Sequence, residues 1–333
     1  MKKKISIVVP NLTEPHKEAI RKAAQEKGCE LRFFDPGINN AGIQDEYIMS
    51  SEIVFGHQPA IAKASTCLKW MCTPFAGVDQ LTKPDSFANE EAQLTNSSGA
   101  YGVTISEHVL MLLLQILRRE PEYRTIVRNK EWRRDLAIRS VYGSRITLLG
   151  TGDIGIETAK RLKAFEPKAI IGVNRSGKRR TDDKDNKNCE DPFDRIVKND
   201  DLNSVLPETD ILIISLPGTK ETFHMLNKER LALLPDGGII INVGRGSVID
   251  QAALTEELNK GRLYAGLDVF EEEPIPQSDP AWTQKNLLLT PHTAGNMTLP
   301  HTVDRIVEMF LKDLDNYCEG RPLQHLVQRD RGY

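Results

Sequence analysis

Three polar side chains in the second half of the chain lie where a predicted strand ends. Arg245 sits between two glycines in INVGRGSVID, Glu273 precedes a proline in GLDVFEEEP, and His292 follows a proline in TPHTAG. Because open α/β sheets bind ligands at the carboxyl ends of their strands, we expect the three to share one site. Each alone also has an ordinary structural explanation: a solvated turn arginine, a surface carboxylate or a hydrogen-bonded core histidine.

Together the three side chains match the needs of 2-keto acid reduction. The guanidinium of Arg245 is a planar fork that can hold a carboxylate and a carbonyl oxygen. The imidazole of His292 can donate a proton near neutral pH. Glu273 beside it would fix its tautomer and keep it protonated for the reductive direction. A nicotinamide cofactor would supply the hydride.

A glycine-rich segment supplies a candidate site for that cofactor. GTGDIG, residues 150–155, stands between an apolar strand and a helical pattern. In this context Gly150 allows the tight turn, Gly152 lets the backbone approach a pyrophosphate, and Gly155 lets helix pack on strand. The following helix offers free N–H groups and a positive dipole end to the phosphates. A plain glycine-rich turn is the alternative explanation.

The end of the next strand indicates which dinucleotide is bound. An NAD site places Asp or Glu there, about 20 residues after the loop, on the ribose hydroxyls. This chain has Asn174, followed by Arg175 and Ser176. Since these residues would accept a 2′-phosphate that a carboxylate would repel, we expect NADP(H) to be favoured over NAD(H). The alternative is a solvated basic loop, because acidic residues follow from Asp182.

Strands that alternate with helices position these segments and predict parallel α/β sheets. We expect a buried helix from residue 106, a charged connection over 118–139, a solvated loop over 175–195 and further helices at 14–27 and 300–318. The second part forms one doubly wound unit of about six strands. The expected strands are residues 5–9, 30–34, 53–56 and 68–71, then 144–149, 169–173, 210–215, 238–243, 264–270 and 286–289.

Composition narrows the class of protein. The 333 residues hold 44 basic and 47 acidic side chains, a net charge of −3, which argues against nucleic acid or an anionic membrane as partner. The longest apolar run is too short to span a bilayer, and Pro10 interrupts any signal-peptide core. The five cysteines form no CxxC pair, and no metal site is expected. We expect these cysteines to be reduced, buried thiols, and we expect a cytoplasmic location. The five are Cys29, Cys67, Cys72, Cys189 and Cys318.

Nearly the whole chain resembles the D-2-hydroxyacid dehydrogenase family. The motifs that carry the resemblance are GTGDIG, INVGRGSVID, GLDVFEEEP, TPHTAGNMT, LKWMCTPFAGVD and NSSGAYGVTISEHVL. The resemblance implies a Rossmann cofactor domain over 100–294 and a discontinuous flavodoxin-like substrate domain over 1–99 and 295–333. It also implies a cleft between them, hinges near 98–101 and 293–296, and a homodimer formed through the cofactor domain.

The family resemblance also assigns roles to individual residues. It implies that Arg245, Glu273 and His292 are catalytic. It implies that the backbone around Ala76 and Gly77 joins Arg245 and His292 in holding the substrate. Phe75 is a further candidate to line the pocket, although packing is the commoner role of an aromatic ring. The expected cofactor-binding residues are Thr104, Gly150, Gly152, Asp153, Ile154, Gly155, Asn174, Arg175, Ser176, Leu216, Pro217, Thr222, Val243, Gly244, Asp268 and Ala294.

Two departures from the family pattern refine the expectation. Asp153 stands where many members carry a basic residue, and the acidic residue after the second strand is absent. The second departure moves the chain toward the NADP-using branch, and LKWMCTPFAGVD is most like the glyoxylate/hydroxypyruvate reductases. We therefore expect an oxidoreductase that reduces a short 2-keto acid to a D-2-hydroxy acid with NADPH.

Other functions and other residues stay open at this stage. A dinucleotide-sensing, corepressor-like binding protein would use the same fold, as would an NAD-linked relative acting on 3-phosphoglycerate, phosphite or formate. His57 could touch the substrate or simply begin a helix. His108 is expected to make an interhelical hydrogen bond, and Trp70 to pack rather than line a pocket.

Overall fold

The computed structural model describes residues 2–38, 43–179 and 191–330. They form two compact units: unit 1 is Met1–Tyr101 with Asn296–Tyr333, and unit 2 is Gly102–Gly295. Each unit holds one sheet in which every strand pair is parallel. The predicted α/β class with two parallel sheets is therefore confirmed. Within the described ranges, no helix has the length and apolar character to cross a bilayer.

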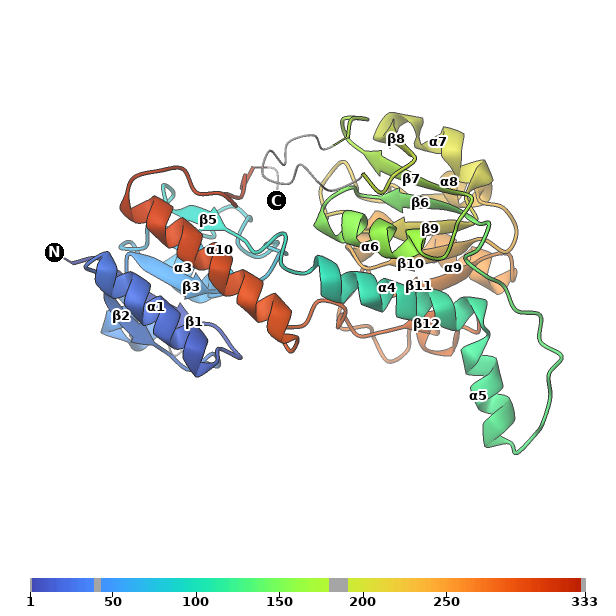
Figure 1. Cartoon of the computed structure of the whole chain (residues 1–333), viewed down its shortest axis with the longest axis horizontal. Helices are drawn as coiled ribbons and strands as arrows, with labels where there is room; N and C mark the ends of the chain where they lie inside the picture. The colour runs from blue at the N-terminus through green and yellow to red at the C-terminus, as the bar shows by residue number, and fades with distance from the viewer. Residues whose placement is uncertain (1, 39–42, 180–190, 331–333) are drawn as a thin grey trace. The chain divides into compact units, whose positions relative to one another are not determined.

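Unit 1 is built on a five-stranded sheet with the order β2-β1-β3-β4-β5, the flavodoxin-like order. Its inner strands are buried on both faces because helices cover both sides of a parallel sheet. In Figure 1, α1 and α10 lie side by side on this unit. The elements are β1 Lys4–Val8, α1 Glu14–Glu26, β2 Glu30–Phe33, α2 Glu46–Met49, β3 Ile53–Gly56, α3 Pro59–Ala64, β4 Trp70–Cys72, β5 Gln93–Thr95 and α10 Pro300–Cys318.

A stack of aromatic rings joins α10 to the sheet of unit 1. The ring of Phe310 lies 4.1 Å from that of Phe55 and 5.6 Å from that of Trp70, measured between centroids. Tyr317 also stacks on Trp70, at 5.2 Å. The indole N–H of Trp70 donates to Thr95 Oγ1 at 2.9 Å. Trp70 is thus fully buried and packs in the core, as the sequence indicated.

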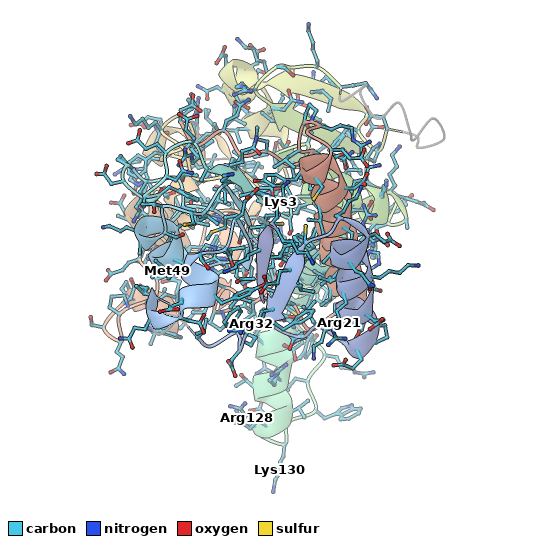
Figure 2. The ribbon with its side chains drawn as sticks, turned by 90° about the vertical axis from the view of Figure 1, so that its left-hand side faces the viewer. Lys3, Arg21, Arg32, Met49, Arg128 and Lys130 are labelled. Atoms are coloured by element: carbon cyan, nitrogen blue, oxygen red, sulfur yellow. The ribbon has the colours of Figure 1, made fainter. Side chains whose placement is uncertain are left out.

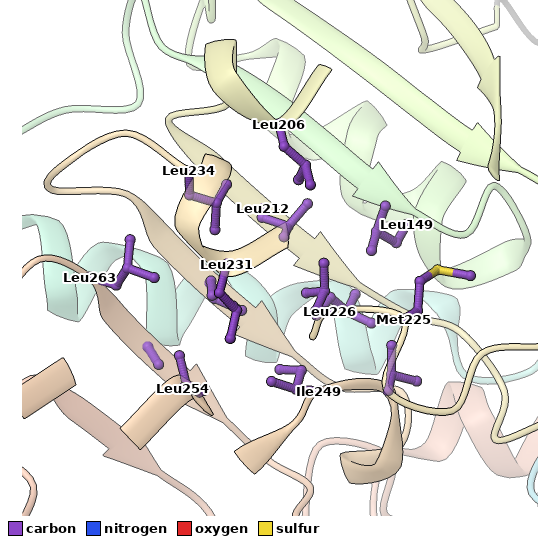
Figure 3. Packing of buried hydrophobic residues seen from close by; sticks show 14 of the residues in the cluster. Leu149, Leu206, Leu212, Met225, Leu226, Leu231, Leu234, Ile249, Leu254 and Leu263 are labelled. Atoms are coloured by element: carbon purple, nitrogen blue, oxygen red, sulfur yellow. The ribbon is translucent and has the colours of Figure 1, made fainter. Parts of the chain in front are cut away.

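Unit 2 is built on a seven-stranded sheet with the order β12-β11-β10-β9-β6-β7-β8. Strand order reverses between β6 and β9, and at such a point a doubly wound sheet binds its ligand. Leucines and isoleucines from β6, β9, α8 and α9 meet in one apolar cluster (Figure 3). Each fully buried side chain of this kind stabilises the fold by about 1.5–3 kcal/mol. The strands are β6 Arg145–Leu149, β7 Ala169–Asn174, β8 Arg195–Lys198, β9 Ile211–Ile214, β10 Ile239–Asn242, β11 Tyr264–Leu267 and β12 Leu287–Leu289.

The long apolar helix of unit 2 begins earlier than expected and is not buried all round. The helices are α4 Gly102–Leu117, α5 Glu120–Arg128, α6 Asp153–Lys163, α7 Leu202–Val205, α8 Lys228–Leu233 and α9 Gln251–Asn259. α4 packs against α5, α6, β10 and β11. Met111 on its outer face is 39% exposed, so the prediction of a helix enclosed between two layers is wrong.

Several short or polar elements differ from the sequence-based expectation. The unit 2 sheet has seven strands rather than about six, because the edge strand β8 is only half-buried and gives a weak apolar signal. The charged connection contains α5, in which only Ile126 is buried. α2, α3 and β5 were too short to recognise. The sequence also predicted a loop over 175–195. Residues 180–190 of it, which include Cys189, lie outside the described residues.

Candidate active site

The glycine loop joins β6 to α6 and leaves open space where a ligand must approach. A Cβ on Gly155 would lie 2.1 Å from the carbonyl oxygen of Gly150, which itself has φ +105°. These two positions therefore require glycine for the turn and for helix packing. A Cβ on Gly152 would meet nothing within 4 Å. Since Gly152 immediately precedes α6, the absent side chain leaves the helix N-terminus accessible to an anion.

Asp153, the departure in this loop, turns its carboxylate toward α4. A Cβ added to Gly102 would lie 2.6 Å from Asp153 Oδ2. Gly102 is the first residue of α4, where a negative charge interacts favourably with the helix dipole. Thr104 lies in the same first turn. Ile154 follows in the first turn of α6.

Asn174 ends β7, and its side chain builds the loop behind it. Oδ1 accepts the amide N–H groups of Ser176 at 3.1 Å and Gly177 at 2.7 Å. Nδ2 donates to Thr151 Oγ1 at 2.9 Å and to the carbonyl of Lys178 at 2.9 Å. The side chain thus forms an Asx turn and ties this basic loop to the glycine loop.

The loop that Asn174 organises presents its basic residues to solvent. Arg175 and Ser176 are exposed. Arg179 pairs with Asp191, Nη1 to Oδ2, at 2.7 Å. The exposed guanidinium of Arg175 is a donor suited to a phosphate, whereas the hydroxyl of Ser176 donates to Asn174 Oδ1 at 3.2 Å.

The loop after β9 is closed by its own threonine. Thr222 Oγ1 donates to the carbonyl of Pro217 at 2.7 Å and accepts the amide N–H of Thr219 at 2.8 Å. Its hydroxyl therefore fixes the loop shape that follows the buried Leu216. A Cβ added to Gly218 would lie 3.3 Å from Cγ of Arg245, so this loop packs against the aliphatic part of the arginine side chain.

Arg245 stands in a turn that only glycine neighbours allow. A Cβ on Gly244 would lie 2.5 Å from the carbonyl oxygen of Leu216, and one on Gly246 would lie 1.9 Å from the carbonyl carbon of Phe270. The buried Asn242 closes the turn, donating to the carbonyl of Arg245 at 3.0 Å and accepting the Gly244 amide at 3.0 Å. The backbone of Arg245 is thereby held between two neighbouring loops.

Asp268, buried after β11, clamps the segment that carries the histidine. Oδ1 accepts the Thr290 hydroxyl at 2.6 Å and the Thr293 amide at 2.9 Å, while Oδ2 accepts the Ala294 amide at 3.0 Å. The amide of His292 donates to the carbonyl of Asp268 at 2.9 Å. These bonds hold His292 at φ +53°, a left-handed conformation that costs a non-glycine residue about 1–2 kcal/mol.

Glu273 and His292 form a direct pair. His292 Nδ1 lies 2.7 Å from Glu273 Oε2, and the other carboxylate oxygen accepts the Phe270 amide at 2.8 Å. The pairing makes Nδ1 the donor and leaves Nε2 of a half-exposed imidazole for another partner. An imidazolium so oriented can deliver a proton to an oxygen placed before it.

His108 contacts the hydrogen-bonded pair of Asp268 and Thr290 rather than another helix. Its Nε2 lies 2.9 Å from Thr290 Oγ1 and 3.6 Å from Asp268 Oδ1. Both partners lie in loops after strands, so the predicted interhelical contact is wrong. Burial lowers the pKa of His108, and the Asp268 carboxylate opposes that shift.

The remaining candidates lie in unit 1 after β4. The carbonyl of Ala76 accepts from Asn96 Nδ2 at 2.9 Å, and the carbonyl of Phe75 accepts the Ser97 amide at 3.1 Å. Gly77 follows, half-buried, in the same loop. The ring of Phe75, 38% exposed, meets the edge of His57 at 5.6 Å.

His57 links the ends of two neighbouring strands. It directly follows β3, and its Nδ1 lies 3.1 Å from Thr73 Oγ1, just after β4. Burial lowers the pKa of this imidazole.

The site residues of unit 2 therefore follow the carboxyl ends of β6, β7, β9, β10, β11 and β12, at one edge of one sheet. Val243 and Ala294 contribute buried positions there. Sequence reasoning did not single out Asn242, Thr151 and Thr290, although each lies within a quoted motif, INVGRGSVID, GTGDIG and TPHTAG respectively. Across the parts of the chain that the structure describes, His, Cys, Asp and Glu side chains form no group of three or more arranged for a metal ion.

The chain is similar in sequence to known dehydrogenases. Residues 110–294 match the family model for the D-isomer specific 2-hydroxyacid dehydrogenase NAD binding domain. A glyoxylate reductase of Thermofilum pendens is 30% identical over 279 residues, which cover 81% of this chain and 78% of that protein.

Two solved structures share the fold over almost the full length. One is a D-isomer specific 2-hydroxyacid dehydrogenase family protein from Aeromonas salmonicida, with TM-score 0.83, 29% identity and coverage of 99% of this chain and 100% of that one. The other is an NADPH-dependent glyoxylate/hydroxypyruvate reductase from Sinorhizobium meliloti in complex with NADP and sulfate. It has TM-score 0.79, 26% identity and full coverage of both chains.

Proposed function

Because the chain belongs to the D-isomer specific 2-hydroxyacid dehydrogenase family and is an NAD(P)-dependent oxidoreductase, we propose that it reduces a short 2-keto acid with NADPH. Glyoxylate and hydroxypyruvate are the first substrates to test, since similar proteins are named for them. With hydroxypyruvate, the product is the D-2-hydroxy acid. The 2.7 Å pair of His292 and Glu273, at the same sheet edge as Arg245 and the glycine loop, carries the proposal.

The proposed roles follow from what each side chain can do. Arg245 holds the substrate carboxylate and polarises the carbonyl oxygen with its two-pronged guanidinium. A nicotinamide cofactor held at the glycine loop would supply the hydride for the carbonyl carbon. His292 Nε2 gives its proton to the oxygen as negative charge develops there. Glu273 accepts from Nδ1 and stabilises the imidazolium before that transfer.

The substrate has a second proposed anchor in unit 1. We assign the loop of Phe75, Ala76 and Gly77 to binding of the substrate carboxylate. Its carbonyls are already engaged by Asn96 and Ser97, which fixes the loop. A preorganised loop binds a small anion without the entropic cost of ordering it.

The residues around the glycine loop fit a dinucleotide. The open space at Gly152 and the N-terminus of α6 suit a pyrophosphate. We propose that Thr104, Leu216, Pro217, Val243 and Ala294 line the rest of that site. The side chains of Thr222 and Asp268 are hydrogen-bonded to backbone groups of the surrounding loops. We therefore propose that they maintain the shape of the cofactor site.

The proposed preference for NADPH rests on the loop after β7. Arg175 is an exposed donor, and Asn174 brings no negative charge to repel a 2′-phosphate. The Ser176 hydroxyl, which donates to Asn174, lies beside Arg175 in the same loop. Arg175→Ala is expected to raise KM for NADPH by about 10- to 100-fold, the loss of one charge-assisted contact of about 1.5–3 kcal/mol. KM for NADH is expected to stay within about twofold.

The decisive experiment is a panel of 2-keto acids assayed with NADPH and NADH in parallel. We expect turnover of glyoxylate or hydroxypyruvate, faster with NADPH. His292→Gln is expected to lower kcat by about 10²- to 10⁴-fold with cofactor binding retained. His16→Gln, at an α1 position paired with Asp304, is the matched control and keeps full activity. NADPH binding without turnover of any keto acid would refute the proposal.

We also propose a cytoplasmic location, since the cysteines of the sequence form no CxxC pair.

We further propose a homodimer formed through unit 2. α5 and the segment after it extend from the sheet of unit 2 in Figure 1. They expose Val127, Trp132, Ile138 and Tyr142, with Trp132 93% exposed. An apolar surface of this kind is suited to a second copy of the chain.

Light scattering of variants tests the assembly. Trp132→Asp and Val127→Asp are expected to give half the mass of the wild-type particle, since each places a charge in an apolar interface. Trp282→Asp, which changes an exposed tryptophan elsewhere on unit 2, is expected to leave the mass unchanged. A wild-type protein with the mass of one chain would contradict the homodimer.

A further inference from the structure

Two cysteines from distant parts of the sequence meet in unit 1. Cys29 lies between α1 and β2, and Cys318 is the last residue of α10. Their sulfur atoms are 4.0 Å apart although 289 positions separate them in the chain. Both side chains are partly buried and both thiols are free. Cys67 is exposed, which corrects the expectation that every cysteine is a buried apolar residue.

An ion-pair cluster fixes the backbone on both sides of this cysteine pair. Lys27 Nζ contacts Asp315 and lies 2.7 Å from Glu319 Oε1. Lys27 precedes Cys29 by two residues, while Asp315 and Glu319 flank Cys318. Arg321 contacts both carboxylates as well. Because these contacts hold α1 and α10 together, the approach of the two sulfurs is set by the fold rather than by two mobile side chains.

An open pocket borders Cys29. It measures about 290 Å³, and Lys2, Arg21, Gly28 and Cys29 contribute to its lining. Figure 2 labels Arg21, which lies on α1. Lys2 places a positive charge beside this pocket, which favours a ligand that bears a carboxylate, whereas Arg21 is paired with Glu14 and Glu18. Burial raises the pKa of Cys29 to about 11, with the neighbouring Cys318 adding to the rise, so thiol exchange at neutral pH is slow.

We propose that Cys29 and Cys318 are a redox-modifiable pair that a low-mass disulfide bearing carboxylates, of the glutathione disulfide class, converts to an intramolecular disulfide. The sulfur of one cysteine, after losing its proton, attacks the disulfide and expels one thiol of the oxidant. The second cysteine sulfur then attacks this mixed disulfide and expels the other thiol. Two protein thiols lose two electrons and two protons, and the oxidant becomes two thiols.

The modest movement required supports this chemistry. A disulfide bond is about 2.05 Å long, so the two sulfurs, which lie 4.0 Å apart, must approach by about 2 Å. The bond would join the N-terminal and C-terminal segments of unit 1. Since it closes a very long loop, the unfolded state would be strongly restricted and unit 1 would unfold at a higher temperature.

Peptide mapping of the full chain tests the pair directly. The reduced protein is incubated with excess glutathione disulfide, remaining thiols are alkylated, and the digest is analysed by mass spectrometry. We expect a crosslinked peptide containing Cys29 and Cys318, and a rise of several degrees in the unfolding temperature that a reductant reverses. Cys67→Ser is the matched control and should give the same crosslink.

The single variants Cys29→Ser and Cys318→Ser distinguish a pair from two independent thiols. Each is expected to lose both the crosslink and the thermal shift, and to carry one glutathione on the remaining cysteine. If Cys29 and Cys318 of the wild-type protein are instead both alkylated, both glutathionylated, or crosslinked to Cys67, the proposal is overturned. The peptide map of the wild-type protein separates these outcomes even if a variant fails to fold, and it requires no enzymatic activity.

Discussion

Replacing Asp268 by Asn tests how the histidine segment is held. The carboxylate accepts three hydrogen bonds, from the Thr290 hydroxyl and from the Thr293 and Ala294 amides, and is 1% exposed. An asparagine keeps the shape but turns one acceptor into a donor. Whichever way the amide is placed, its NH₂ group faces a backbone N–H, so two buried donors oppose each other.

The expected loss of stability is about 1–3 kcal/mol, the cost of leaving a buried donor unsatisfied. The catalytic consequence is larger, because these bonds hold His292 in its left-handed conformation. Movement of a catalytic group by about 1 Å lowers the rate by about 10²-fold. We therefore expect kcat of Asp268→Asn to fall about 100-fold.

Chemical denaturation and steady-state kinetics measure both effects. Asp250→Asn is the matched control: Asp250 caps α9 through one bond to the Ala253 amide, and asparagine caps a helix equally well. Its stability is expected to change by less than about 0.5 kcal/mol. If Asp268→Asn is as stable and as active as Asp250→Asn, the clamp does not position the histidine.

Four further variants have defined outcomes. Glu273→Gln removes the charge beside the imidazole, so kcat should fall about 10- to 100-fold with KM for NADPH unchanged; equal kcat in steady-state assays would contradict the pairing. His108 is held neutral because burial lowers its pKa, so its contribution to stability is complete above about pH 6.5 and is lost as pH falls below that value. Denaturation between pH 5 and 8 should show a weaker pH dependence in His108→Gln than in wild type, and parallel curves would refute this. Gly152→Ala should fold normally but bind NADPH weakly, whereas Gly155→Ala should unfold more readily, because only the second Cβ meets backbone; thermal unfolding and cofactor titration separate the two.

The motifs themselves were predictable because each reflects a local requirement. The glycine loop needs a strand before it, a helix after it and no side chain at Gly150 or Gly155, and all of these are visible in the sequence. Likewise, Arg245 between two glycines indicates a turn that other loops approach closely. Alternation of strands and helices indicated the parallel sheets.

The parts that could not be predicted depend on long-range packing. His108 meets Thr290, 182 residues away, and no spacing in the sequence encodes that contact. Asn174 was expected to face a cofactor, yet its amide also organises the loop, which depends on where Thr151 comes to lie. The edge strand β8 was missed because half-buried strands lack a continuous apolar run.

The ring stack in unit 1 has a consequence for synthesis on the ribosome. Phe55 and Trp70 emerge early, but Phe310, the ring that covers them, lies in α10 and is translated only after all of unit 2. Unit 2 is continuous and can fold while translation proceeds. Until α10 has been synthesised, the first hundred residues therefore lack the ring that covers Phe55 and Trp70 in the folded protein.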